Sequence, residues 1–108
     1  MKKEWMALAA AASVLLPGVA LAGTAADMQA LADKNGCFSC HGMQSKLVGP
    51  GFAEVAAKYK GDSQAAERLA KKIREGGKGV WGPVPMPPHG NLGEGDAKKL
   101  AEWVLNVG

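Results

Sequence analysis

Apolar residues recur with a helical period in four segments of the chain beyond residue 23. The first predicted helix begins at Thr24, which forms a pattern like a capping box with Asp27, and it ends at Gly36. The second begins at Phe52 and stops at Gly61. The residues expected to point inward are Met28, Leu31 and Ala32 in the first helix, and Phe52, Val55, Ala56 and Tyr59 in the second.

Two further helices are predicted in the second half of the chain. One is capped by Ser63 and ends at Gly76, and the other runs from about Glu94 to Val107, where we expect it to cross the first helix. Four basic residues of the third helix are expected to face water: Arg68, Lys71, Lys72 and Arg74. The inward faces are Ala66, Leu69, Ala70 and Ile73 in the third helix, and Leu100, Trp103, Val104 and Val107 in the fourth.

The segment from Gly76 to about Gly93 is dense in glycine and proline and shows no helical pattern. A connection of this length is unusual in a small domain, so we expect a functional loop held by something other than secondary structure. The chain has no internal repeats and no linker. The pattern therefore predicts one all-α domain with about four helices and a long Pro/Gly-rich loop.

The first 22 residues read as a secretory signal peptide. Lys2 and Lys3 precede an apolar stretch over residues 5–16, and Ala20-Leu21-Ala22 forms an A-x-A cleavage site. An uncleaved membrane anchor is the alternative, but the stretch falls short of the ~20 apolar residues that a bilayer requires. We therefore expect export to the periplasm and a mature domain of residues 23–108.

The charge of the chain gives no reason to expect a nucleic-acid partner. The full chain has 13 basic and 10 acidic residues, and no arginine-rich or aromatic-interleaved run appears in it. Positive charge is concentrated in residues 58–78, where seven basic and three acidic side chains leave a local charge of +4. We interpret this run as a solvated helix face, with an acidic redox partner as the second interpretation.

Residues Cys37-Phe38-Ser39-Cys40-His41 form C-x-x-C-H, the attachment signature of a c-type haem. If the segment is helical, both thiols and the imidazole project from one face, where they could hold one flat ligand. Two alternatives use the same residues. The first is a dithiol oxidoreductase, but the sequence around the motif lacks the alternating strands and helices expected of such an enzyme. The second is a zinc or copper site completed by His89.

Met86 is the candidate for the second axial ligand of such a haem. It lies in the proline-rich stretch of residues 79–88, where Pro85, Pro87 and Pro88 bar a helix and stiffen the backbone that presents the thioether. Core filler is the usual role of a methionine. A thioether opposite an imidazole favours ferrous iron, and a six-coordinate iron transfers electrons rather than binding oxygen.

These motifs make the chain resemble a small bacterial class I cytochrome c of the cytochrome c-551/c-552 group. The resemblance covers residues 24–108 and rests on C-F-S-C-H at 37–41, V-G-P at 48–50, G-V-W-G-P-V-P-M-P-P at 79–88 and L-A-E-W-V-L at 100–105. It implies a class I cytochrome c fold wrapped around one covalently attached haem c. The roles it implies are thioether formation by Cys37 and Cys40, axial ligation by His41 and Met86, a Pro50 carbonyl that accepts the His41 Nδ1 proton, and a buried Trp81 that donates to a haem propionate.

The resemblance also implies a function. It suggests an electron carrier rather than an enzyme, working as a monomer between a membrane cytochrome complex and a terminal oxidase or nitrite reductase. Two alternatives remain: a fixed subunit of a larger oxidoreductase, and a small haem peroxidase or gas sensor in which Met86 leaves the iron. In one place the chain departs from the group, because His89 replaces a common asparagine. We expect its imidazole to turn outward and its protonation to modulate the reduction potential.

Overall fold

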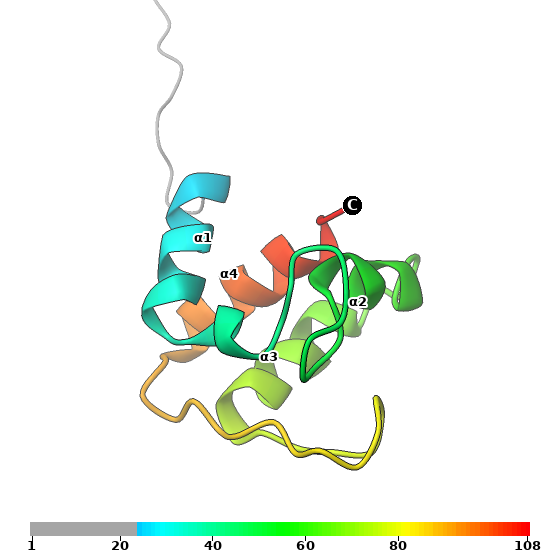
Figure 1. The fold of residues 1–108 in the computed structure, drawn as a ribbon. Helices are drawn as coiled ribbons and strands as arrows, with labels where there is room; N and C mark the ends of the chain where they lie inside the picture. The colour runs from blue at the N-terminus through cyan, green and yellow to red at the C-terminus, as the bar shows by residue number, and fades with distance from the viewer. Residues whose placement is uncertain (1–23) are drawn as a thin grey trace, which may run out of the picture.

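The structure is a computed structural model that describes residues 24–108, so the predicted signal peptide at residues 1–22 lies outside the described residues. Residues 24–108 contain four α-helices and one 3-10 helix and no strand (Figure 1). In chain order these are α1 (Ala25–Lys34), η1 (Cys37–Ser39), α2 (Phe52–Lys58), α3 (Ala65–Glu75) and α4 (Glu94–Leu105). The predicted number and order of helices are confirmed. No helix of this part of the chain combines the length and apolar character needed to cross a bilayer.

Helix α1 begins and ends as its sequence predicts. The Thr24 hydroxyl accepts a hydrogen bond from the Asp27 backbone N–H at 3.1 Å, which satisfies one of the free donors of the first turn. At the other end, the Asn35 side-chain amide donates to the Leu31 carbonyl at 2.9 Å. Gly36 then takes a φ of 75°, a conformation that glycine adopts readily, and turns the chain into η1.

The predicted start of α3 is wrong by one residue. Ser63 lies in a turn before the helix, and Gln64 is the N-cap residue without a side-chain cap. The Asp62 carboxylate takes the role expected of Ser63, because it accepts a hydrogen bond from the Gln64 N–H at 2.9 Å and pairs with Arg68. At the start of α3, the Asp62 carboxylate therefore accepts the backbone hydrogen bond that was expected to go to the Ser63 hydroxyl.

Helix α4 packs against all three other helices and forms the centre of the fold (Figure 1). The predicted crossing with α1 is confirmed, because Met28 and Ala32 of α1 form one buried cluster with Leu100 of α4 and Leu92. A second buried cluster joins Phe52 and Val55 of α2 to Val104 of α4, and Trp103 and Phe38 pack against both clusters. The core is therefore divided into two parts that meet at η1 and α4.

The loop between α3 and α4 is held by hydrogen bonds to its own ends and to α3. Gly77 and Met86 exchange two backbone hydrogen bonds, of 3.1 Å and 2.7 Å, and the His89 N–H donates to the Ile73 carbonyl at 3.0 Å. Arg74 was expected to face water, but it is half-buried and its Nε donates to the Leu92 carbonyl at 3.0 Å. A side chain of α3 therefore supplies one of the contacts that fix this loop.

Gly76 should be the least replaceable glycine of the loop. Its φ of 74° and ψ of −174° belong to a region that is essentially restricted to glycine, and a Cβ there would lie 2.5 Å from the Met86 carbonyl oxygen. We expect Gly76→Ala to lower the free energy of unfolding by about 3 kcal/mol or more. Urea unfolding of the purified protein measures this loss.

Gly61→Ala is the matched control for this prediction. Gly61 also has a positive φ, of 83°, but a Cβ there would meet nothing within 4 Å. Its substitution should cost only the conformational penalty of about 1–2 kcal/mol. Equal losses for the two variants would show that the close approach of Gly76 to Met86 does not contribute to stability.

Candidate functional site

A single cavity lies between the two core clusters and brings the predicted site residues together. It holds about 1300 Å³ of empty space, counting the part that is open to solvent. Cys37, Cys40 and His41 line one side, and Met86 reaches it from the loop before α4. The rest of the wall is mainly apolar and comes from α2, α3, α4 and the loop, with residues such as Val55, Tyr59, Leu69, Ile73, Leu100, Ala101 and Val104.

The C-x-x-C-H segment is less helical than one face of an α-helix would require. Only residues 37–39 are helical, and they form a 3-10 turn in which Cys40 and His41 both donate backbone hydrogen bonds to the Cys37 carbonyl, at 3.2 Å and 3.0 Å. The conditional expectation of an α-helix through residue 41 is therefore wrong. Even so, the two cysteines and the histidine line the same cavity, because the tight turn folds all three towards it.

The environment of the cysteines argues against dithiol chemistry. Burial raises the pKa of the Cys37 thiol, and a backbone hydrogen bond only partly opposes that effect. A nucleophilic cysteine of an oxidoreductase needs the opposite shift, towards thiolate. The two cysteines form no disulfide with each other. Cys37 therefore lacks the pKa shift that dithiol chemistry requires.

A zinc site is not supported either. Within residues 24–108, no three side chains of histidine, cysteine, aspartate or glutamate converge as metal ligands. His89, the fourth ligand in that alternative, does not line the cavity that holds the C-x-x-C-H residues. The four residues of the proposed set are therefore not brought to one point.

The His41 imidazole is held by the Pro50 carbonyl. The distance from Nδ1 to the carbonyl oxygen is 2.7 Å, so Nδ1 donates a short hydrogen bond. Pro50 itself is buried, and the residues around it connect back to the haem motif, since the Gly49 N–H donates to the Cys40 carbonyl at 2.7 Å. A neutral imidazole that donates from Nδ1 leaves the lone pair of Nε2 free for a metal.

Trp81 and Lys58 meet at the mouth of the cavity. Trp81 lines the cavity. A buried indole was expected at this position, but Trp81 is 41% exposed. The Lys58 ammonium at the end of α2 lies 5.5 Å from the centroid of the indole ring, within range of a cation–π contact. This contact joins α2 to the loop that carries Met86.

Lys72 is a site residue that the sequence analysis missed. It was expected to face water, but it is half-buried and lines the cavity, whereas its neighbour Lys71 is exposed. The signal was its spacing, since Lys72 lies three residues after Leu69 and so shares the inward face of α3. In the described part of the chain, the charged residues of the cavity wall are Lys46, Lys72 and Lys78, and no carboxylate joins them.

The expected outward turn of His89 is wrong. Its Nδ1 is buried and has no hydrogen-bond partner in the structure, and its backbone N–H is tied to Ile73 of α3. The fixed backbone directs the ring against the protein instead of into water. The prediction that protonation of His89 modulates a reduction potential stays a prediction.

The cavity fits a haem in shape and in charge. Its walls are mainly apolar, as a flat hydrophobic ring requires, and two thiols and one oriented imidazole approach it from η1 and the two residues that follow it. The three lysines provide positive charge for the two carboxylates that a haem carries. Without a cofactor, large side chains would have to fill this space. None of the described residues supplies a large side chain that is fully buried.

Comparison with known proteins agrees with this fit. The family model described as Cytochrome c matches residues 25–108. Cytochrome c-552 of Nitrosomonas europaea is 46% identical over 107 residues, which cover 99% of each chain, and cytochrome c-551 of Pseudomonas aeruginosa is 43% identical, covering 87% of this chain and 91% of its own. The crystal structure of the Nitrosomonas europaea cytochrome c552 superposes with a TM-score of 0.71 at 48% identity, covering 74% of this chain and 99% of that one.

The matches decide one of the alternatives that the sequence left open, that of a haem enzyme. Relatives of this group are electron carriers, so the peroxidase alternative is not supported. The fold is that of the class I cytochromes c, in agreement with the helices and with the superposition. The chain belongs to the cytochrome c family, carries covalently bound haem c and transfers electrons.

Proposed function

We propose that the mature chain is a soluble periplasmic carrier of one electron, with its haem bound through Cys37, Cys40, His41 and Met86. One observation carries this proposal above the others. The oriented imidazole of His41 and the thioether-bearing Met86, which are far apart in the sequence, line the same cavity as both cysteines. Among residues 24–108, no other methionine lines that cavity.

Each of these residues has a distinct task in the proposal. Cys37 and Cys40 form two thioether bonds, which make the cofactor a permanent part of the core. His41 binds the iron through Nε2, because its Nδ1 proton is engaged by Pro50 at 2.7 Å. When bound, the haem supplies an iron that alternates between the ferrous and ferric states, and a thioether from Met86 favours the ferrous state.

Lys72 and Trp81 are the residues we assign to the haem propionates. Lys72 is half-buried in the cavity wall, where its ammonium can pair with a carboxylate. Trp81 lines the cavity from the loop and can donate only through its indole N–H. The two residues come from α3 and from the loop, so a shared carboxylate partner would tie these segments together.

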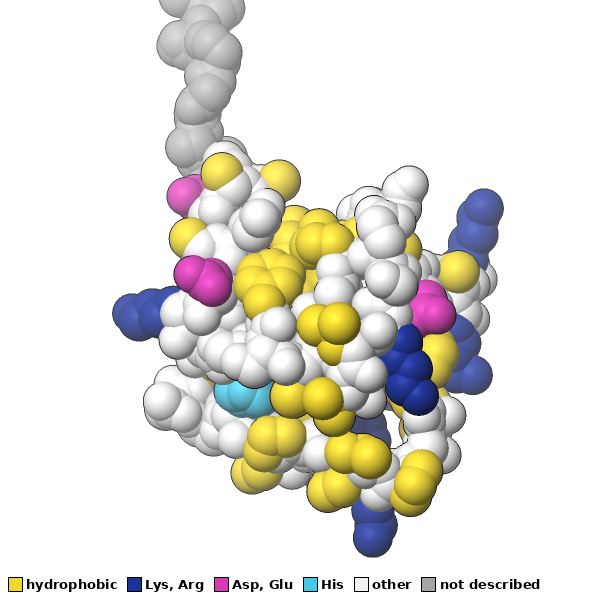
Figure 2. All heavy atoms as spheres, in the orientation of Figure 1, with side chains coloured by type: hydrophobic (Ala, Val, Ile, Leu, Met, Phe, Trp, Pro, Cys, Tyr) yellow, Lys and Arg dark blue, Asp and Glu magenta, His cyan; other side chains and the backbone are white. Residues whose placement is uncertain are grey.

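The electron leaves through the mouth of the cavity, where exposed apolar side chains gather. Five large hydrophobic residues are 41–58% exposed, and four of them line the cavity: Val48, Val80, Trp81 and Val84, with Leu47 adjacent. Figure 2 shows hydrophobic side chains collected over the lower part of one face, with lysine or arginine at its margin. Such a patch suits brief contact with a redox partner.

The partners we propose are respiratory redox complexes. A membrane cytochrome complex would donate the electron, and a terminal oxidase or a nitrite reductase would accept it. The lysines of the cavity wall favour partners with acidic rims, which gives the second interpretation of the basic residues 58–78 a physical basis. The chain acts as a monomer in this scheme, because transient contact at one patch is all that the transfer needs.

Periplasmic location is supported by the N-terminal sequence and by the extent of the matches. The curated cytochrome c-552 of Nitrosomonas europaea aligns with 99% of this chain, whereas the crystal structure of that cytochrome aligns with 74%. The difference fits a leader that the mature relative has lost. Residues 1–22 carry the charge, apolar stretch and small-residue motif of such a leader.

Cleavage and haem attachment should appear together in the mass of the exported protein. We expect the protein from a periplasmic fraction to begin at Gly23 and to carry one haem that resists acid extraction. Intact mass spectrometry measures both properties. Replacing Cys40 with alanine should leave a single thioether, visible as a shifted band in the pyridine haemochrome, and a normal spectrum would contradict the assignment.

Met86→Ala should remove the sulfur ligand of the iron. We expect the near-infrared band of the ferric protein to disappear and the reduction potential to fall, because a thioether stabilises ferrous iron. Met43→Ala is the control, since Met43 packs against the core cluster of α2 without lining the cavity. An unchanged spectrum for Met86→Ala would refute its role as the ligand.

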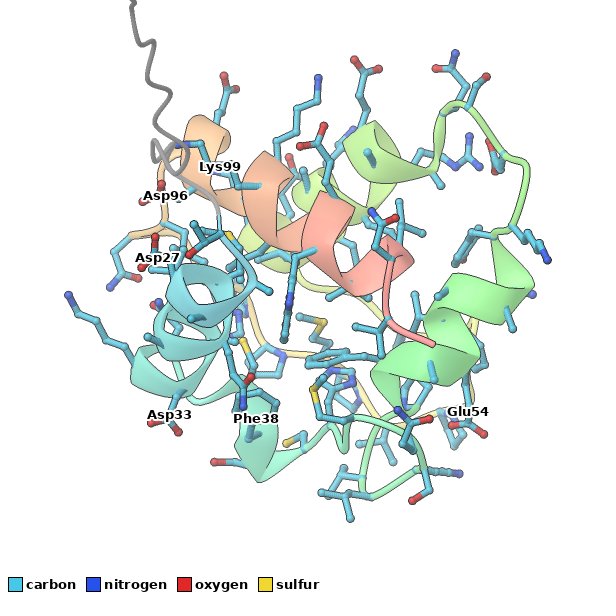
Figure 3. The ribbon with its side chains drawn as sticks, turned by 90° about the horizontal axis from the view of Figure 1, so that it is seen from above. Asp27, Asp33, Phe38, Glu54, Asp96 and Lys99 are labelled. Carbon is cyan, nitrogen blue, oxygen red and sulfur yellow. The ribbon has the colours of Figure 1, made fainter. Side chains whose placement is uncertain are left out.

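Lys78→Glu should slow electron transfer to an anionic oxidant. Lys78 lines the cavity mouth, so reversing its charge repels ferricyanide there and weakens the salt dependence of the rate. Stopped-flow oxidation of the ferrous protein measures the rate constant. Lys99→Glu is the control, since Lys99 lies on the outer surface of α4 and does not line the cavity (Figure 3). Equal slowing by both variants would show that the electron does not leave through this mouth.

A further inference from the structure

The segment from Gly49 to Phe52 surrounds the His41 imidazole more completely than a single hydrogen bond requires. Its carbonyl at Pro50 accepts the Nδ1 proton, and its first and last residues both contact the ring itself. This segment is fixed to the haem motif by backbone hydrogen bonds, from Gly49 to the Cys40 carbonyl at 2.7 Å and from Phe52 to the Gly42 carbonyl at 2.9 Å. Because these bonds tie residues 49–52 to the backbone on both sides of His41, the segment and the imidazole that it surrounds move together.

Gly49 places bare backbone against the face of the imidazole. A Cβ at this position would lie 2.9 Å from Cε1, 3.2 Å from Nδ1 and 3.3 Å from Nε2 of His41. Such similar distances to three consecutive ring atoms mean that the Cβ would stand over the face of the ring and not beyond its edge. Only glycine leaves the ring where it is, because real Cβ atoms do not approach other atoms this closely.

Phe52 stacks on the same imidazole. The two ring centroids are 5.0 Å apart and the ring planes differ by 21°. Phe52 is itself 5% exposed and is held edge-on by two further rings, Trp103 at 5.5 Å and Phe38 at 5.8 Å. A ring packed in this way has little freedom to rotate, so it can restrain its neighbour.

We propose that Phe52 and Gly49 are positioning residues that set the rotational orientation of the axial imidazole. This inference rests on the proposed ligation by His41. A hydrogen bond at Nδ1 fixes one edge of the ring but leaves it free to rock about the line from Nδ1 to the carbonyl oxygen. Contacts with the ring face oppose that rocking, and they hold the imidazole plane in one direction relative to the haem.

The direction of this plane matters for the ferric state. The imidazole π-orbital overlaps with one iron d-orbital, so the ring plane selects the direction in which unpaired spin spreads over the porphyrin. A plane that is already fixed also needs no rearrangement when the iron changes oxidation state, and rapid electron transfer depends on such small rearrangements. Phe52 and Gly49 thus act on the iron through His41.

The proton NMR spectrum of the ferric protein tests this role, because the haem methyl resonances report the direction of spin delocalisation. We expect Phe52→Leu and Gly49→Ala to change the order or the spread of the four methyl shifts. Phe52→Tyr keeps the ring and should retain the wild-type pattern. Val107→Ala is the matched control, since Val107 packs against the core cluster that contains Phe52 but does not line the cavity, and it should also retain the pattern.

A wild-type methyl pattern in both Phe52→Leu and Gly49→Ala would overturn the proposal. The same pattern change in Val107→Ala would also overturn it, because general loosening of the core cluster around Phe52 would then be the cause. The near-infrared sulfur band of each variant separates this outcome from a failure of the proposed function. If the wild-type protein lacks that band, the ligand assignment is wrong. If every variant keeps the band and the methyl shifts are unchanged, the ligand assignment holds and only the positioning role is refuted.

Discussion

The fold depends on filling one apolar cavity that its own side chains leave open. The two core clusters are small, and the core residues with no exposed surface are alanines, namely Ala32, Ala97 and Ala101. A chain with 85 described residues buries too little apolar area for high stability by such packing alone. Covalent haem supplies the missing surface, so the cofactor works as both a structural element and the redox centre.

The two sides of the cavity are built by different means. The His41 side consists of short contacts within a single compact segment, in which a turn, a carbonyl and a stacked ring restrain one imidazole. The Met86 side is a long loop without helix, and its position depends on the glycine at residue 76 and on contacts from α3, including Arg74. The imidazole side is therefore locally determined, whereas the thioether side depends on the packing of distant segments.

This difference explains how much could be predicted from the sequence. The helices follow from local periodicity and caps, and Thr24 and Gly36 behave as expected. The errors concern side chains whose partners are distant in the sequence or are not encoded by a pattern. Arg74 is half-buried because Leu92 offers it a carbonyl, and His89 is turned inward because its backbone is fixed to Ile73. No helical period contains that information.

Charge around the cavity links the binding of the cofactor to the surface that meets a partner. Lys46, Lys72 and Lys78 line an apolar space, and no carboxylate is among its lining residues in the described part of the chain. If the haem carboxylates pair with this wall as proposed, they would offset two of the three positive charges and leave about one at the mouth. The same lysines would then both hold the cofactor and give the chain the weakly positive, apolar surface that it presents to a partner.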